Sequence, residues 1–345
     1  MKQLISIIIP NYNGGRTIGR CLESIYGVRD DDVEVIVVDD GSQDGSVEII
    51  KKYQCKLIRL EKHAGASAAR NAGVAAATGT VLFFIDADCL IKEDTLSMIR
   101  QSFSEHPDAV LGGTYTPVPA DPGFFNQFQS VFINHSETNS TSPDYIATHA
   151  MIVPAVMFRK VGGFTEKFLP ILEDVEFSHR LRKAGVRLII NPGIQVRHIF
   201  NFSLMKSLRN AVRKTRYWSE YSLANKDIFV NSGTASRGIK INGGCWLLSV
   251  LLMLSSIASG QSALLAALPI LWFAGIAANG LLLSAFYRTG GIWFALAAGA
   301  YYVWVYPAAI WIGAGRGIFQ YLIRNRKRQD GGSPRQPVLP GSNKG

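Results

Sequence analysis

The feature that most restricts how this chain can fold is a set of long apolar stretches after residue 240. They are Ile241–Ala258, Ser262–Tyr287 and Ile292–Ile312. Each is near or above the roughly 20 residues that an α-helix needs to cross a bilayer. Inside a membrane, backbone polar groups must be satisfied within the segment, which favours helices. We therefore predict that residues 241–315 contain about three transmembrane helices.

The basic charge of the chain flanks these stretches. The formal net charge is +10 over 345 residues. Residues 205–240 carry +6, residues 316–345 carry another +6 and Arg288 adds one, which leaves residues 1–204 slightly acidic, at −3. A protein that binds nucleic acid carries its basic footprint on the folded domain, so we expect no nucleic-acid partner. Basic clusters beside apolar helices instead indicate contact with anionic membrane lipids.

The segments on either side of the apolar stretches differ in character. Residues 203–240 begin with a basic amphipathic pattern, which indicates either a helix on a membrane surface or an ordinary solvated helix. Residues 316–345 are polar, basic and rich in glycine and proline, which predicts a disordered tail. Three crossings would put this tail on the far side of the membrane, against the positive-inside tendency. Either one apolar stretch is re-entrant or the tail departs from that tendency.

The first two hundred residues alternate between short apolar strands and amphipathic helices. The predicted strands are Leu4–Ile9, Val33–Val38, Lys56–Leu60, Thr80–Ile85 and Val186–Ile190. The predicted helices are Arg16–Tyr26, Ser46–Tyr53, Ser67–Ala77, Asp94–Phe103 and Glu173–Ala184. This alternation indicates βαβ units and a mostly parallel sheet covered on both faces. Residues 112–150, with four prolines and many Ser, Thr and Asn residues, are predicted to be loop-rich.

The cysteines indicate a reducing environment. There are four, at Cys21, Cys55, Cys89 and Cys245. No two of them have C-x-x-C spacing, so the sequence indicates neither a zinc site nor a disulfide framework. The apolar run at the N-terminus is too short for a signal peptide. We expect the domain formed by residues 1–202 to lie in the cytoplasm.

Two carboxylates follow the most apolar predicted strand. Asp86 and Asp88 come directly after Thr80–Ile85, at the carboxyl end of a strand, where α/β sheets bind ligands. Side chains two residues apart on an extended chain point the same way. Two carboxylates directed together repel each other unless a cation lies near them. We therefore expect a hard divalent cation, Mn²⁺ or Mg²⁺, that also contacts phosphate oxygens.

Acidic pairs occur at two other predicted boundaries. Asp39 and Asp40 follow the second strand, where they could accept hydrogen bonds from a base or a ribose, or form a turn with an Asx cap. Glu173 and Asp174 open a helix, where a carboxylate either caps free N–H groups or serves as a general base. The sequence leaves both alternatives open at each pair.

Six short motifs occur in a fixed order over residues 4–200. They are Ile8–Asn13, Val37–Ser42, Ala69–Gly73, Phe84–Asp88, Val161–Phe164, and Glu173–Asp174 with Arg180–Leu181. In order and spacing they resemble the family 2 glycosyltransferases of the GT-A fold. The resemblance implies a Rossmann-like α/β domain over residues 1–202 that binds a nucleotide-sugar, followed by an all-α membrane region.

The resemblance also implies a nucleotide site. Pro10 and Tyr12 would line the base pocket, with the Tyr12 ring stacked on the base. Asp40 would hydrogen-bond the base, with support from Asp39. Arg70 would hold the nucleotide end of the site. The donor would then be a nucleotide-sugar, with UDP as the favoured nucleotide.

A metal site and a catalytic base are implied in the same way. Asp88 would ligate the cation on the diphosphate, Asp86 would contact the ribose or a metal-bound water, and His198 would contact the diphosphate or the metal. Asp174 would take the proton from an acceptor hydroxyl. The hydroxyl would attack the anomeric carbon from the face opposite the leaving group, so the configuration inverts in a single displacement.

These features together imply an enzyme of the cytoplasmic membrane that glycosylates a hydroxyl of a lipid-linked or membrane-borne acceptor in cell-envelope glycan or glycolipid synthesis. A polyprenyl phosphate is an alternative acceptor. A non-catalytic membrane scaffold that retains the fold is an alternative of another class. The run Pro10–Gly15 lacks G-x-G-x-x-G, which argues against a dinucleotide-dependent enzyme. The run Arg213–Trp218 lacks the Q-x-x-R-W of processive members, which argues against a polysaccharide synthase.

Overall fold

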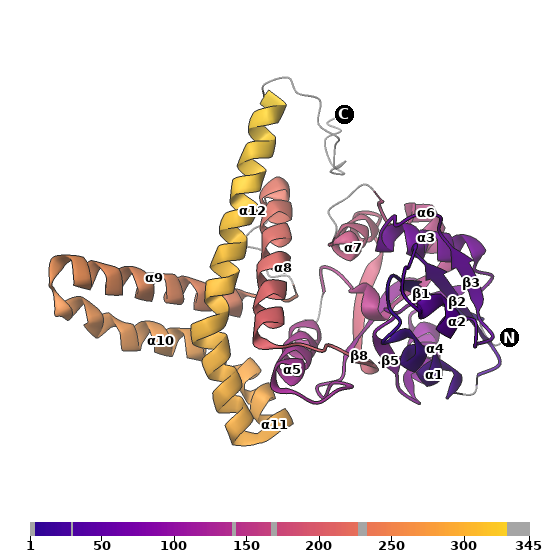
Figure 1. The fold of residues 1–345 in the computed structure, drawn as a ribbon, viewed down its shortest axis with the longest axis horizontal. Coiled ribbons are helices and arrows are strands. Elements are labelled where there is room, and N and C mark those ends of the chain that lie inside the picture. The colour runs from indigo at the N-terminus through magenta and orange to yellow at the C-terminus, as the bar shows by residue number, and fades with distance from the viewer. Residues whose placement is uncertain (1–3, 29, 140–142, 167–170, 227–232, 330–345) are drawn as a thin grey trace. The chain divides into compact units, whose positions relative to one another are not determined.

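A computed structural model of the chain describes residues 4–28, 30–139, 143–166, 171–226 and 233–329, and they divide into two units (Figure 1). The first unit contains the residues up to Pro122 together with Glu137–Asn201. The second contains Gly123–Ser136 together with the residues from Phe202 onward. The first unit is an α/β domain, and the described part of the second consists of helices. The predicted fold class is confirmed.

The first unit is built on an eight-stranded sheet. In spatial order its strands are β3 (Lys56–Arg59), β2 (Val33–Asp39), β1 (Ile5–Asn11), β4 (Val81–Phe84), β7 (Met151–Pro154), β6 (Ala109–Tyr115), β8 (Arg187–His198) and β5 (Cys89–Ile91). The first four pair in parallel, as do β6 and β8, whereas β7 and β5 run antiparallel to their neighbours. The predicted parallel pairing holds for the N-terminal half, and the sheet as a whole is mixed.

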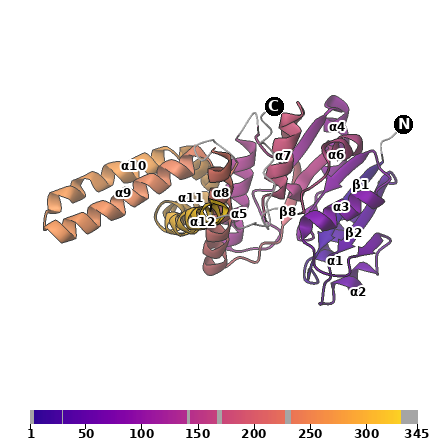
Figure 2. The same cartoon turned by 90° about the horizontal axis from the view of Figure 1, so that it is seen from above.

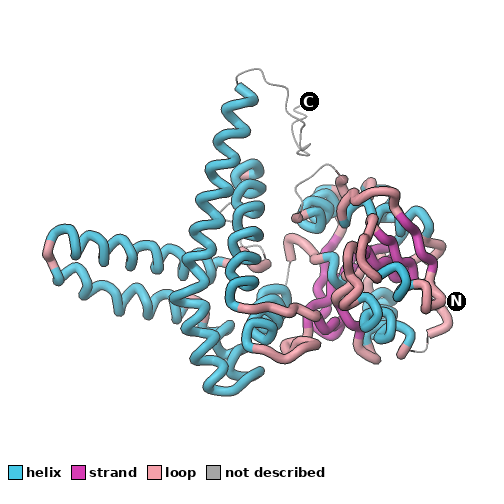
Figure 3. Tube along the Cα trace, in the orientation of Figure 1, coloured by secondary structure: helices cyan, strands magenta, loops and turns pink. Residues whose placement is uncertain are grey.

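Helices cover this sheet, which Figure 3 shows as magenta strands among cyan helices. They are α1 (Ile18–Tyr26), α2 (Ser46–Ile50), α3 (Ala66–Ala76), α4 (Thr95–Glu105), α6 (Ala155–Val161) and α7 (Glu173–Lys183). The side chains of β4 are all buried because both faces of the sheet are covered. On α3, a Cβ atom at Gly73 would lie 2.5 Å from Ile8 Cγ2. Glycine therefore lets α3 approach β1 closely, and Arg70, one turn earlier on α3, is buried beside the sheet.

Residues 112–150 differ from the predicted loop-rich segment. They complete β6 and contain α5 (Phe124–Thr138) and a short 3₁₀ helix, η1 (Thr148–Ala150). Within α5, Phe128, Val131 and Phe132 recur at helical spacing and are buried. The prediction is wrong here because the prolines that indicate loops lie before and after the helix, not within it.

The second unit contains α5 and the helices that follow residue 202. The latter are α8 (Leu204–Asn225), α9 (Arg237–Ser259), the 3₁₀ helix η2 (Ser262–Ala267), α10 (Leu268–Ala277), α11 (Gly280–Ala300), the π-helical segment η3 (Tyr301–Val305) and α12 (Tyr306–Gln329). α9 packs against η2 and α10, and α8 lies beside α12 in both Figure 1 and Figure 2. Ser203 and Ser236 cap α8 and α9, because their side-chain oxygens accept hydrogen bonds from backbone N–H groups of the first turns.

Glycines on one face of α12 allow α8 and α12 to pack closely. A Cβ atom on Gly313 would lie 2.6 Å from Val212 O, and one on Gly317 would lie 2.9 Å from Ser219 Cβ. Small residues four positions apart permit such close approach of two helices. By contrast, a Cβ atom on Gly315 would have no atom within 4 Å.

The packing of α12 changes the interpretation of the C-terminal segment. Residues 316–329 continue α12 and are helical, so the prediction that they belong to a disordered tail is wrong. Helices gain most of their stability from tertiary packing, and the contact with α8 supplies it here. Residues 330–345 lie outside the described residues.

Two described helical segments are long and apolar enough to cross a membrane, Arg237–Ser259 and Gly280–Arg326, and Ser262–Ala277 is a shorter apolar one. The second is interrupted at Gly291, whose φ of 74° is left-handed. All three predicted apolar stretches are therefore mainly helical within the described residues. That they cross a membrane, and that α8 lies on its surface, stay predictions.

The glycine contact between α8 and α12 predicts opposite effects for two neighbouring alanine substitutions. Gly313→Ala places a methyl group against the backbone of α8, which we expect to destabilise the second unit by about 1–3 kcal/mol. Gly315→Ala, the matched control, adds a methyl group in open space and replaces glycine by a better helix former, which is worth about 1 kcal/mol. Melting temperatures of the detergent-solubilised variants should fall for the first and stay level or rise for the second. Equal shifts for both would contradict this packing.

Candidate active site

The carboxyl ends of β1, β2 and β4 lie at one edge of the sheet, because these strands are parallel neighbours. Asn11 ends β1 and Asp39 ends β2, and Asn11 Nδ2 donates to Asp39 Oδ1 at 3.0 Å. Asp86 follows β4 by two residues. Residues from three separate sequence motifs therefore share the edge at which α/β sheets bind ligands.

Asp40 is buried and organises the segment that precedes α3. It accepts hydrogen bonds from Ala64 N at 2.7 Å and from Gly65 N at 2.8 Å, and its Oδ2 lies 2.8 Å from His63 Nδ1. Asp39 is also buried, and supports this edge through Asn11. The Asp39–Asp40 pair therefore has a structural role. Its role in binding a base stays a prediction.

An exposed aromatic surface lies beside Asp40. The Tyr12 side chain is 48% exposed, and its ring stacks on the His63 imidazole with a centroid separation of 3.9 Å and an interplanar angle of 25°. Pro10 lies two residues earlier on β1. A flat, exposed ring is suited to stack on a planar base. The sequence analysis did not identify His63, which no motif includes, and the roles of Pro10 and Tyr12 stay predictions.

Arg70 joins two acidic residues from distant parts of the chain. It is only 3% exposed, and its Nη2 lies 2.7 Å from Asp86 Oδ1 while its Nη1 lies 2.7 Å from Glu173 Oε1. Burial by itself raises the pKa of Asp86, but the positive charges of Arg70 and then His149 outweigh it and lower that pKa below its ordinary value. Asp86 is therefore held ionised by the protein itself.

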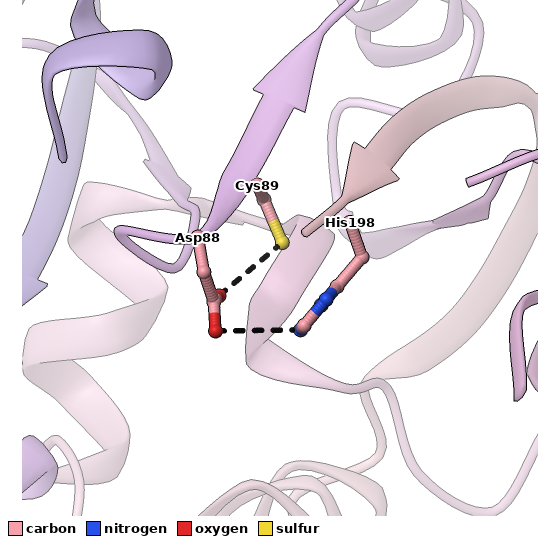
Figure 4. Close-up of side chains that lie close together, drawn as sticks. All are labelled: Asp88, Cys89 and His198. Carbon is pink, nitrogen blue, oxygen red and sulfur yellow. Dashed lines mark hydrogen bonds and ion pairs between the residues drawn. The ribbon is translucent and has the colours of Figure 1, made fainter. Parts of the chain in front are cut away.

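Asp88 has the opposite electrostatic environment (Figure 4). Antiparallel pairing of β5 with β8 sets Cys89 opposite His198, so that His198 Nε2 lies 3.5 Å from Asp88 Oδ2. Cys89 Sγ lies 3.9 Å from Asp88 Oδ1. Burial, together with the negative charge of Asp86, raises the pKa of Asp88 to about 7. A cation at this position would stabilise the ionised form of Asp88 and lower that pKa.

The donor atoms around Asp88 fit a divalent metal ion. Asp88, Cys89 and His198 each offer one ligand atom, all within 4.8 Å of one another. A carboxylate oxygen and an imidazole nitrogen suit a cation such as Mn²⁺. Burial raises the pKa of the Cys89 thiol well above its ordinary value, and sulfur ligands suit softer metal ions than Mn²⁺ or Mg²⁺. Asp88 and His198 are therefore the residues whose donor atoms fit such an ion, and the predicted metal roles of Asp86, Asp88 and His198 stay predictions.

Three residues beside this cluster were missed in the sequence. The Tyr115 ring stacks on His149 with centroids 4.0 Å apart and meets the edge of His198 at 4.9 Å. Glu137 Oε2 lies 3.4 Å from His149 Nε2 and accepts from Thr114 Oγ1 at 2.7 Å. These residues fall in the segment predicted to be loop-rich. The apolar run that forms β6 was the available signal for Tyr115.

Asp174 lies in the first turn of α7. Its Oδ1 accepts a hydrogen bond from the backbone N–H of the next residue, Val175, at 2.8 Å. The preceding Leu172 has a φ of 86°, a strained conformation for a residue with a side chain. The neighbouring Glu173 contacts Arg70. The two carboxylates thus differ in role, and the function of Asp174 as a general base stays a prediction.

Comparison with known proteins identifies the domain. Residues 6–161 match the family model described as glycosyl transferase family 2. The glycosyltransferase GlyG of Streptococcus pneumoniae serotype 4 is 32% identical over 131 residues, which are 36% of this chain and 44% of GlyG. The glycosyltransferase AglE of Haloferax volcanii is 29% identical over 192 residues, which are 53% of this chain and 63% of AglE. The chain thus spans less than two thirds of the length of either relative.

A solved structure shares the fold over most of the chain. The mannosyltransferase PcManGT from Pyrobaculum calidifontis, solved in complex with GDP-Man and Mn²⁺, matches with a TM-score of 0.57 and 17% identity over 93% of this chain and 88% of that one. The first unit therefore has the GT-A fold. Residues 6–161 of the chain are similar in sequence to the family 2 glycosyltransferases.

The raised pKa of Asp88 predicts how the metal-free protein responds to pH. The folded protein keeps a proton on Asp88 up to about pH 7, whereas the unfolded chain has lost it above about pH 4. The folded state therefore loses stability as the pH rises between these values. Asp88→Asn removes this loss, so its melting temperature in EDTA should rise relative to that of the unmutated protein between about pH 4 and pH 8.

The matched control for this measurement is Asp108→Asn, at an exposed position on the loop before β6. Its melting temperature should follow that of the unmutated protein at every pH. A constant difference between Asp88→Asn and the unmutated protein over the same range would contradict the electrostatic environment described for Asp88.

Proposed function

We propose that this protein is an inverting, metal-dependent glycosyltransferase that transfers a sugar from a nucleotide-sugar to a hydroxyl of a lipid-linked or membrane-associated acceptor. UDP is the nucleotide that the sequence resemblance favours. The observation that supports the proposal best is the grouping of Arg70, Asp86, Asp88 and His198 at the carboxyl edge of a GT-A sheet. The proposed setting is the cytoplasmic membrane, with the first unit in the cytoplasm and a role in cell-envelope glycan or glycolipid synthesis.

Asp88 and His198 are the proposed metal ligands, with Mn²⁺ or Mg²⁺ as the ion. When bound, the ion would neutralise negative charge on the departing nucleoside diphosphate. The mannosyltransferase from Pyrobaculum calidifontis was solved in complex with GDP-Man and Mn²⁺, which supports the proposal of a divalent ion. Arg70 keeps Asp86 ionised and fixed, so that Asp86 can accept hydrogen bonds from the ribose.

The remaining residues have proposed roles in binding and proton transfer. The base of the donor would stack on Tyr12, whose ring is exposed beside His63. Pro10 and Asp40 would complete the base pocket, with Asp39 holding the strand ends together. Asp174 would accept the proton of the acceptor hydroxyl as that oxygen bonds to the anomeric carbon and the diphosphate leaves from the opposite face. The configuration at that carbon would then invert.

The second unit supports an acceptor with a hydrocarbon chain. A pocket of about 500 Å³ is lined by Phe124, Phe125, Leu204, Ala297, Ala300, Tyr301, Trp304 and Val305. These side chains are apolar or aromatic and come from α5, α8, α11 and η3. A concave surface of this kind suits the apolar part of a lipid-linked sugar.

Removal of the proposed base tests the type of acceptor. Asp174→Asn should lower transfer to a hydroxyl acceptor by about 10²–10⁴-fold, because an uncharged amide cannot take the proton. Binding of the nucleotide-sugar with Mn²⁺, measured as a rise in melting temperature, should persist in this variant and be lost in Asp88→Asn. If Asp174→Asn transferred normally to every acceptor while Asp88→Asn was inactive, the assignment of the base would be wrong. Normal transfer to polyprenyl phosphate alone would favour the phosphate-acceptor alternative.

Filling the apolar pocket tests its role in binding the acceptor. Ala297→Trp places an indole in the pocket, so we expect a raised KM for acceptors with long hydrocarbon chains. Hydrolysis of the donor without an acceptor should not change. Leu296→Trp, at the neighbouring exposed position, is the matched control. An unchanged KM for long-chain acceptors in Ala297→Trp would contradict the role of the pocket.

A further inference from the structure

The helices α9 and η2–α10 form a closed hairpin. Asn279, just after α10, donates through Nδ2 to Gly238 O in the first turn of α9 at 3.1 Å. Further along, a Cβ atom on Gly275 would lie 2.9 Å from Asn242 Oδ1. Both views show the pair as one arm, with the turn that follows Ser259 at its tip (Figure 1; Figure 2). The chain therefore enters and leaves this arm at the same end, so a crossing by α9 requires a return by α10.

The arm has the length and surface of a membrane-spanning hairpin. The 23 residues of α9 extend about 34 Å, and η2 with α10 extends about 27 Å, against a hydrocarbon core of about 30 Å. Large apolar side chains on it are exposed, including Leu251, Leu254 and Ile257 on α9 and Ile270 and Phe273 on α10. No charged residue occurs from Ile241 to Tyr287. An apolar surface of this kind is suited to contact the hydrocarbon core of a bilayer rather than water.

Polar contacts fix the base of the arm. Asn242 Nδ2 donates to Tyr302 O at 3.0 Å, and the Tyr302 hydroxyl donates to Asn279 Oδ1 at 3.0 Å. These groups are buried. The two ends of the hairpin are thus joined to each other and to η3, and the arm has one fixed direction relative to the rest of the second unit.

Tryptophans gather near the same base. Trp246 Nε1 donates to Trp304 O and Trp311 Nε1 donates to Gly243 O, both at 2.8 Å, and the rings of Trp272 and Trp304 lie 6.1 Å apart. Indole rings concentrate at the boundary between hydrocarbon and headgroups. Their position on the half of the arm nearer its base indicates that the base, and not the tip, lies at the membrane surface from which the hairpin begins.

The later apolar segment is unsuited to cross. α12 packs along α8, where Arg216 Nε donates to Gln320 Oε1 at 2.8 Å and Arg324 pairs with Glu220. A crossing by α12 would therefore carry α8 into the bilayer. Exposed basic residues on α8 are Lys206, Arg209, Arg213 and Lys214. Charged side chains are costly at the centre of a bilayer, whereas anionic headgroups attract them.

The direction of the helices is consistent with a membrane crossing by the arm and not by α12. In both views α8 and α12 run crosswise to the arm (Figure 1; Figure 2). If the arm is perpendicular to the membrane, α8 and α12 lie along its surface. The chain that precedes them is interrupted at Gly291, three residues after the charged Arg288. Continuous helix therefore does not extend from Gly280 to the end of α12.

We propose that the second unit binds a bilayer of anionic phospholipids by a single hairpin insertion. α9 and η2–α10 cross the membrane, and α8 with α12 lies on the headgroups of the leaflet at which the hairpin begins. The chain then crosses twice and not three times, which replaces the expectation of three transmembrane helices. All the basic clusters stay on one side, together with Arg237, Lys240 and Arg288 at the base, so the positive-inside tendency is obeyed.

Labelling of introduced cysteines in the full chain, in membrane vesicles, tests this arrangement, and the buried Cys21 and Cys89 are kept. In a background with Cys55→Ser and Cys245→Ser, the four probes are Lys52→Cys in the first unit, Gln261→Cys at the tip, Arg288→Cys after the hairpin and Arg326→Cys near the end of α12. A membrane-impermeant maleimide is applied to right-side-out and to inside-out vesicles. Detergent-solubilised protein serves as the control that every probe is reactive.

The expected result is that Gln261→Cys reacts from one side and the other three react from the opposite side. Arg326→Cys on the side of Gln261→Cys would establish a third crossing and overturn the proposal. Arg288→Cys on that side would show that α10 does not return. Reaction of Gln261→Cys from the side of Lys52→Cys, or from neither side, would show that the hairpin does not cross. Since no outcome depends on transfer activity, the proposed enzymatic function stands or fails separately.

Discussion

The buried guanidinium of Arg70 is the interaction on which the site depends most. It lies on α3, and its two ion pairs reach Asp86 after β4 and Glu173 at the start of α7. A guanidinium that is 3% exposed is tolerable only when its charge is matched, and removing one partner of such a pair typically costs about 3–5 kcal/mol. The same contacts therefore hold three elements together and fix the carboxylate of Asp86. A lysine, with one compact charge, could not span both carboxylates in this way.

The helices and strands of most of the first hundred residues could be predicted, because the apolar pattern of each segment matches the face that it buries in the fold. The buried strands β1, β2 and β4 are short apolar runs, and α1 buries the residues that recur at helical spacing. The proximity of Asp88 to His198 could not be derived in this way. It depends on β5, a three-residue strand, pairing with β8 more than a hundred residues later. Only the family resemblance indicated His198, and nothing indicated His149 or Tyr115, which pack beside it.

The second unit shows a different limit of sequence reasoning. Apolar composition correctly indicates helices after residue 240, but it does not distinguish a helix that crosses a membrane from one that packs on a neighbour. That distinction rests on specific contacts: Asn279 with Gly238 closes a hairpin, and Gly313 with Val212 joins α12 to α8. Such contacts depend on which helix faces come together. The spacing of Gly313 and Gly317 was visible in the sequence, but its partner helix was not.

Asp86 and Asp88 are two residues apart, yet their surroundings shift the pKa values of the two carboxyl groups in opposite directions. Arg70 supplies a positive charge to Asp86 and lowers its pKa, so this carboxylate is ionised without help from a ligand. The pKa of Asp88 is raised to about 7 by burial and by the negative charge of Asp86. His198 Nε2 lies 3.5 Å from Asp88 Oδ2, yet the pKa of Asp88 stays above its ordinary value. Of the two carboxylates, Asp88 is therefore the one whose ionised form the proposed cation would stabilise more.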